Sequence, residues 1–133
     1  MTSADIKKLR LSGRLDEALT MAQQEYAAQS NGLWQRSALA WVYDAICKRA
    51  AEAGDLEAFR TAFVPLAELG LFGQDNILTD AMSWRLRALL QTGCDRLKDS
   101  VPELVSWGNE VLPLFQLFRP MPRSLATSVL CKT

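Results

Sequence analysis

Two short stretches, 41 residues apart, decide the fold: residues 13–18 read Gly-Arg-Leu-Asp-Glu-Ala, and residues 54–59 read Gly-Asp-Leu-Glu-Ala-Phe. In both, a glycine is followed by leucine and by acidic residues. A third and more divergent copy, Gly-Cys-Asp-Arg-Leu, begins at Gly93, which is 39 residues after Gly54. A recurrence of about 40 residues is typical of proteins that stack one structural unit on the next.

The sequence before each glycine predicts a helix. The apolar positions four and seven residues upstream are Leu9, Ala50 and Leu89, and Ile6, Cys47 and Leu86. Positions three or four residues apart share one face of a helix. Glycine then supplies the left-handed backbone that ends a helix, and acidic residues suit the first turn of the next one. Each unit therefore predicts a helix, a tight turn and a second helix.

We expect helices at residues 3–11, 14–29, 33–53, 55–70, 76–92 and 95–118. The predicted fold is all-α, with antiparallel helix hairpins stacked as a short α-solenoid of about three repeats. It forms one domain over residues 1–118, and residues 119–133 form a tail or capping segment. Pro65, Pro102 and Pro113 fall inside expected helices. Each should kink or split its helix, because proline has no N–H to donate.

The turns resemble those of the tetratricopeptide repeat. The matching residues are Gly13, Leu15, Glu17 and Ala18 in the first copy and, with a slip of one residue, Gly54, Leu56 and Ala58 in the second. The resemblance covers residues 3–92 and implies hairpins that bind peptides or partner proteins. The spacings of 41 and 39 exceed the family period of about 34, so HEAT-like hairpins are the second choice.

Composition limits the chemistry that the chain can perform. Fifteen basic and fifteen acidic residues give a net charge of zero, which provides no electrostatic argument for nucleic acid or an anionic membrane. Histidine, the commonest general base and metal ligand, is missing from the sequence. The three cysteines, Cys47, Cys94 and Cys131, are widely spaced and indicate reduced thiols. We therefore expect no metal site, no cofactor and no enzymatic activity.

Acidic pairs after the glycines, such as Asp16 with Glu17 and Asp55 with Glu57, are interpreted as helix-capping residues rather than catalytic carboxylates. The chain does not open like a signal peptide, and no apolar run reaches the about 18 residues of a membrane span. We expect a cytoplasmic protein without a membrane partner.

Arginines and aromatic residues occur together in two of the expected first helices. The candidate partner-binding residues there are Arg36, Trp41, Tyr43, Trp84, Arg85 and Arg87. Trp, Tyr and Arg are the side chains that most often anchor interfaces, and stacked repeats line one groove with their first helices. The alternative is that Trp41 and Trp84 are core wedges between hairpins, which we favour for the tryptophans. For the arginines, groove and solvated surface stay equally open.

The run Val-Leu-Pro-Leu-Phe-Gln-Leu-Phe at residues 111–118 is strongly apolar. It is either a helix that caps the last hairpin or a docking surface. Because its large side chains surround the helix axis, we expect a homotypic or partner interface centred on Leu114, Phe115 and Phe118.

The function that these patterns favour is a scaffold that binds another protein, or itself, through a peptide, helix or partner domain. A nucleic-acid-associated domain that uses Arg36, Arg85 and Arg87 for phosphates is the alternative. A third possibility is a helical accessory module of a larger multidomain enzyme.

Overall fold

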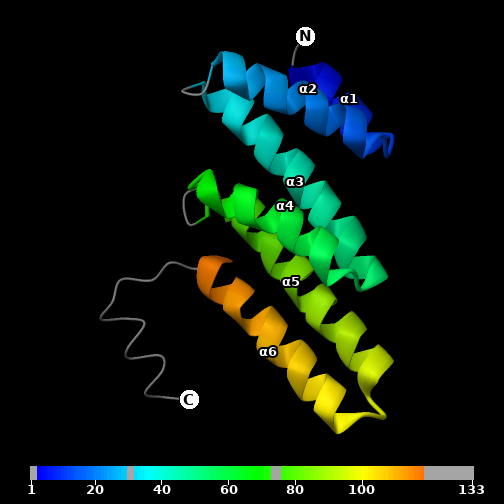
Figure 1. The fold of residues 1–133 in the computed structure, drawn as a ribbon. Helices are drawn as coiled ribbons and strands as arrows, with labels where there is room; N and C mark the ends of the chain where they lie inside the picture. The colour runs from blue at the N-terminus through cyan, green and yellow to red at the C-terminus, as the bar shows by residue number, and fades with distance from the viewer. Residues whose placement is uncertain (1–2, 30–31, 73–75, 119–133) are drawn as a thin grey trace, which may run out of the picture.

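The computed structural model describes residues 3–29, 32–72 and 76–118, and its regular secondary structure there is entirely helical (Figure 1). The helices are α1 (Ser3–Leu11), α2 (Leu15–Ala28), α3 (Leu33–Ala53), α4 (Leu56–Glu68), α5 (Asn76–Leu97) and α6 (Val101–Phe118). The expected all-α class is confirmed, and the first four helices end within two residues of their expected limits. The expected tail or capping segment at 119–133 lies outside the described residues.

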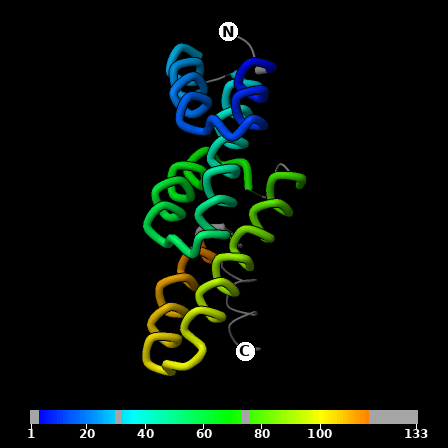
Figure 2. Tube along the Cα trace, turned by 90° about the vertical axis from the view of Figure 1, so that its right-hand side faces the viewer, coloured from blue at the N-terminus to red at the C-terminus, as the bar shows by residue number. Residues whose placement is uncertain are grey.

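Consecutive helices run antiparallel and pack as pairs, α1 on α2, α3 on α4 and α5 on α6 (Figure 1). The first member of each pair also contacts the next first member, so α1 packs on α3 and α3 on α5. We call α1, α3 and α5 the first-helix layer. The second-helix layer is α2, α4 and α6, of which α4 packs on α6 while α2 packs on α3 (Figure 2).

The turn at Gly54 has the expected form. Its φ of 68° lies in the left-handed region, which L-residues with a side chain rarely adopt. The Asp55 N–H donates to the Ala50 carbonyl at 2.9 Å, and the Gly54 N–H donates to that of Ala51 at 3.2 Å, which together cap α3. The Asp55 carboxylate then accepts from the Ala58 N–H at 3.1 Å and caps α4. The expected capping role of Asp55 is therefore confirmed.

The third expected turn, at Thr92-Gly93, is wrong. Helix α5 continues through Gly93 to Leu97, and the chain reverses only before α6 begins at Val101. Gly93 is buried because the indole of Trp107 on α6 lies against it, where a Cβ atom would come within 2.0 Å of the ring. The Trp107 Nε1–H donates to the Leu90 carbonyl at 3.3 Å. Gly93 therefore serves a helix–helix contact and not a turn.

The three prolines do not divide the helices as expected. Pro65 and Pro113 lie inside α4 and α6, neither of which is split. Pro102 is the second residue of α6, where a backbone N–H has no intrahelical partner to lose. Burial of the apolar faces of α4 and α6 offsets the hydrogen bonds that Pro65 and Pro113 remove.

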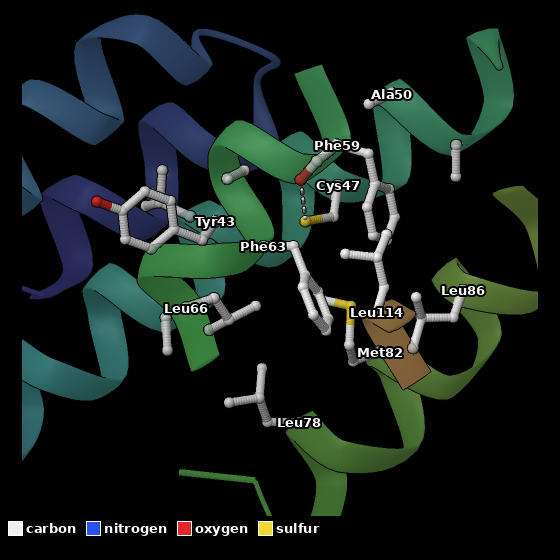
Figure 3. Close-up of a cluster of buried hydrophobic side chains, with 14 of the residues drawn as sticks. Tyr43, Cys47, Ala50, Phe59, Phe63, Leu66, Leu78, Met82, Leu86 and Leu114 are labelled. Carbon is white, nitrogen blue, oxygen red and sulfur yellow. Dashed lines mark hydrogen bonds between the residues drawn. The ribbon is translucent and has the colours of Figure 1, made fainter. Parts of the chain in front are cut away.

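The core lies between the two layers, and most of its largest fully buried side chains come from α3, α4, α5 and α6 (Figure 3). Phe59 and Phe63 of α4 stack with their ring centroids 5.6 Å apart, and Met82 of α5 is fully buried in the same cluster. The thiol of Cys47 on α3 donates to the Phe59 carbonyl at 3.8 Å. Side chains from four helices thus share one apolar interior.

Two helical glycines give a matched test of the packing between α5 and α6. Gly93→Ala places a methyl group into the Trp107 ring, so we expect a loss of about 2 kcal/mol or more in the free energy of unfolding. Gly108→Ala on α6 meets open space and should gain about 1 kcal/mol, the usual helix-propensity difference. Urea denaturation measures both. A Gly93→Ala variant as stable as Gly108→Ala would contradict the contact.

Candidate functional site

Helices α1 and α3 form a hollow of about 390 Å³, which we call the α1–α3 hollow. Its lining residues are Ala4, Ile6, Lys7 and Arg10 of α1 and Trp34, Ser37, Ala38 and Trp41 of α3. Trp34 and Trp41 are seven residues apart, which is two helical turns, so both indoles project from the same side of α3. The hollow therefore combines two indoles with two cationic side chains.

The cations are placed beside the indoles. The guanidinium carbon of Arg10 lies 5.8 Å from the centre of the Trp41 ring, within the range of a cation–π interaction. Lys7 is exposed one turn earlier on α1. The described residues that line the hollow include no carboxylate. Its local charge is therefore positive above an apolar floor.

The two tryptophans that the sequence placed in the core have different environments. Trp41 packs partly against the core and partly lines the α1–α3 hollow. For Trp84 on α5 the expected burial is wrong, because 64% of its surface is exposed. Met82, Leu86 and Leu89 fill the side of α5 that faces the core, and the Trp84 indole projects from the opposite side.

Exposed Trp84 has a cationic neighbour of its own. The guanidinium carbon of Arg87 lies 5.4 Å from the centre of its ring. We call the solvent side of the first-helix layer the outward face; it includes the α1–α3 hollow, Trp84 and Arg87. An indole paired with a cation thus occurs twice on this face.

Arg85 is half-buried and forms an ion pair with a buried carboxylate. Its Nε and Nη2 atoms each lie 3.4 Å from an oxygen of Asp44 on α3, which is long for a charge-assisted hydrogen bond. Burial raises the pKa of Asp44, and Arg85, Arg10 and Lys48 oppose that rise only in part. Arg85 therefore balances a buried carboxylate, which accounts for its position without a ligand.

Three other predicted partner-binding residues lie away from an exposed binding face. Tyr43 is buried, and its hydroxyl accepts a hydrogen bond from Gln23 of α2 at 3.3 Å. Arg36 is partly buried and is not part of the hollow's lining. Leu114 is only 4% exposed and belongs to the core, so its side chain is not available to the interface expected around Leu114, Phe115 and Phe118.

The structure gives less information on the other two residues of that expected interface. Phe115 packs partly against the core, and the side chain of Phe118 lies outside the described residues. Trp107, Val111 and Leu114 form the buried stripe of α6, which covers the core. Among the side chains of α6 that the structure describes, the exposed large apolar ones are Val101, Val105 and Leu112.

The described residues offer little for catalysis or metal binding. Burial, with the charge of Asp44 as a second cause, raises the pKa of the Cys47 thiol far above its ordinary value, so it stays protonated. No group of three or more Cys, Asp or Glu side chains gathers in a metal-binding arrangement within the described ranges. Nor does any helix there have the length and apolar character needed to cross a bilayer.

The sequence interpretation missed Lys7 and Arg10. A signal for them exists, since Lys7 and Arg10 are three residues apart and share one face of the first helix. The meeting of that face with the Trp34 and Trp41 side of α3 depends on how two helices pack, which the spacing alone does not specify.

Charge is unevenly divided between the layers. The basic residues of the first-helix layer are Lys7, Lys8, Arg10, Arg36, Lys48, Arg49, Arg85, Arg87 and Arg96, and its acidic residues are Asp5, Asp44, Glu52, Asp80 and Asp95. The layer thus carries a net charge of +4. The second-helix layer has one basic residue, Arg60, against seven acidic ones, a net charge of −6. The neutral chain therefore presents two oppositely charged sides.

Comparison of the chain with protein-family models, with curated proteins and with solved structures finds no match.

The buried Asp44 makes a prediction about pH. Because burial raises its pKa in the folded protein above the ordinary value of 3.8, the native state binds the proton more tightly than the unfolded chain does. The contribution of this group to stability is therefore greatest below pH 3.8 and is lost as pH rises through the folded-state pKa. The stability of the wild type relative to Asp44→Asn should then increase as pH falls from 7 towards 4.

Urea denaturation at both pH values measures this difference. Asp80→Asn, at an exposed position on α5, controls for the general effect of acid. If the stability of the wild type relative to Asp44→Asn decreased on acidification, the attraction of Arg85 would have a larger effect on the pKa of Asp44 than burial has.

Proposed function

We propose that this protein is a scaffold of three stacked helical hairpins that binds another protein through the outward face of its first-helix layer. In this proposal the hairpins form a short α-solenoid of tetratricopeptide-like type, with HEAT-like geometry as the second choice. The order of contacts supports it, because each first helix packs on the next one and on its own hairpin partner.

The observation that carries the proposal is the exposure of indoles on the outward face. Trp84 is 64% and Trp34 is 39% exposed, although most of the other large apolar side chains that the structure describes are buried or half-buried. Tryptophan and arginine are strongly enriched among the residues that dominate binding energy at protein interfaces. The outward face presents both residue types, at the α1–α3 hollow and at Trp84 with Arg87.

Nucleic acid is the second candidate, favoured by the net charge of +4 on the first-helix layer. Single strands bind along continuous basic grooves with aromatic residues on which successive bases stack. Here four exposed carboxylates interrupt the layer: Asp5, Glu52, Asp80 and Asp95. They would repel a phosphate backbone that ran along the layer, so we favour a protein partner.

Affinity capture with matched variants tests the proposal. The chain is immobilised and exposed to lysate of its source organism, once with and once without nuclease treatment, and the retained proteins are quantified by mass spectrometry. We expect Trp34→Ala and Trp84→Ala to reduce retention of a specific protein about tenfold or more, since indoles at interface hot spots carry that much affinity. The free energy of unfolding of both variants should lie within about 1 kcal/mol of the wild-type value, because these side chains are exposed.

Leu112→Ala is the control, since Leu112 is 55% exposed on α6 in the other layer. It should retain the partner as the wild type does. Equal retention by all four chains would contradict the proposal. Loss of all retention on nuclease treatment would favour the second candidate.

A further inference from the structure

We infer that the α1–α3 hollow binds an aromatic side chain carried by an acidic segment of the partner protein. The inference rests on the proposed function, since it specifies what kind of partner segment occupies one part of the outward face.

The shape and lining of the hollow favour one large apolar side chain. Its volume of about 390 Å³ is near the lower end of the range of about 300–1,000 Å³ for ligand pockets. Ile6 and Ala38 contribute apolar surface, and the Trp34 and Trp41 indoles offer ring surface for contact with another ring. An aromatic ring is the side chain that makes use of both indoles.

The charges around the hollow favour carboxylates beside that ring. Lys7 and Arg10 line it, and the described lining residues contain no acidic side chain to neutralise them. Asp44, whose pKa responds to Arg10, is buried and pairs with Arg85. Asp5 follows the lining residue Ala4 in sequence but is not itself part of the lining. Carboxylates on either side of the bound ring would therefore meet two cations at the rim.

A synthetic peptide provides a direct probe: acetyl-Glu-Asp-Phe-Asp-Glu-amide, titrated into the full chain. The readout is the NMR signals of the four indole N–H groups, assigned with single Trp→Phe variants. We expect the Trp34 and Trp41 signals to move and that of Trp107, which is buried under α5, to stay in place. Peptides with Ala in place of Phe, or with Gln and Asn in place of the acids, should bind about tenfold more weakly.

Variants of the chain test the role of the cations. Lys7→Gln combined with Arg10→Gln should weaken binding of the acidic peptide about tenfold. Lys48→Gln combined with Arg49→Gln removes the same charge from exposed positions of α3 outside the lining, and should change binding less than twofold. Arg10 also contacts Trp41, so its replacement changes the hollow itself. The single variant Lys7→Gln, at an exposed position, repeats the test and leaves that contact in place.

Four results would overturn the inference. The first is an acidic peptide that leaves the Trp34 and Trp41 signals unmoved, and the second is equal weakening by the two double variants. The third is a stronger response of these signals to hexathymidylate, which would make the occupant a nucleic-acid strand. The fourth is movement of the signals when the chain alone is concentrated, which would make the occupant a second copy.

Failure of the inference is distinguishable from failure of the proposed function. If Trp34→Ala abolishes capture of a protein from lysate while the acidic peptide does not bind, a protein partner remains and its chemistry is different. If Trp34→Ala and Trp84→Ala retain as much protein from lysate as the wild type does, the proposed function itself is wrong.

Discussion

Helix α3 contacts α1, α2, α4 and α5, and its buried residues extend over about 200° of its circumference at 100° per residue. A surface helix buries a stripe only about 100° wide, so neighbours on one side cannot cover α3. The first hairpin covers one part of this arc, and α4 with α5 covers the rest. Helix α4 in turn packs on α6, and α6 also packs on α5, so the buried interior that begins at α3 extends to the last described helix.

The solvent side of α3 is what remains, and it is where the candidate site lies. Trp34 and Trp41 project there, opposite the buried arc, and α1 supplies Lys7 and Arg10 beside them. The packing that buries α3 therefore also brings cations from one hairpin to indoles of the next. Segregation of charge between the layers strengthens the positive potential on this side.

Features that depend only on neighbouring residues of the chain were predictable from the sequence. Features that depend on contacts between distant helices were not. Gly54 was identified correctly because a left-handed turn after a helix needs glycine whatever surrounds it. Gly93 was misinterpreted because the reason for it lies on another helix, in the Trp107 ring that occupies the place of a side chain.

The burial of Trp84 was also predicted wrongly. Large apolar residues are buried on average, and the prediction followed that average. The Met82, Leu86 and Leu89 stripe nevertheless decides which side of α5 faces inward. The hollow could not be predicted because it forms only where two helices from different hairpins meet. The division of charge between the layers was hidden as well, because the net charge of the whole chain is zero.

In the proposed function, a partner docks on the outward face of the first-helix layer, at the α1–α3 hollow. Site-specific photocrosslinking measures this most directly, with benzoylphenylalanine placed at Ser37 in the hollow or at Leu112 on α6. The chain with the probe at position 37 should give one discrete crosslinked protein in lysate, and the chain with the probe at 112 should not. A crosslink formed from position 112 and not from 37 would contradict the account.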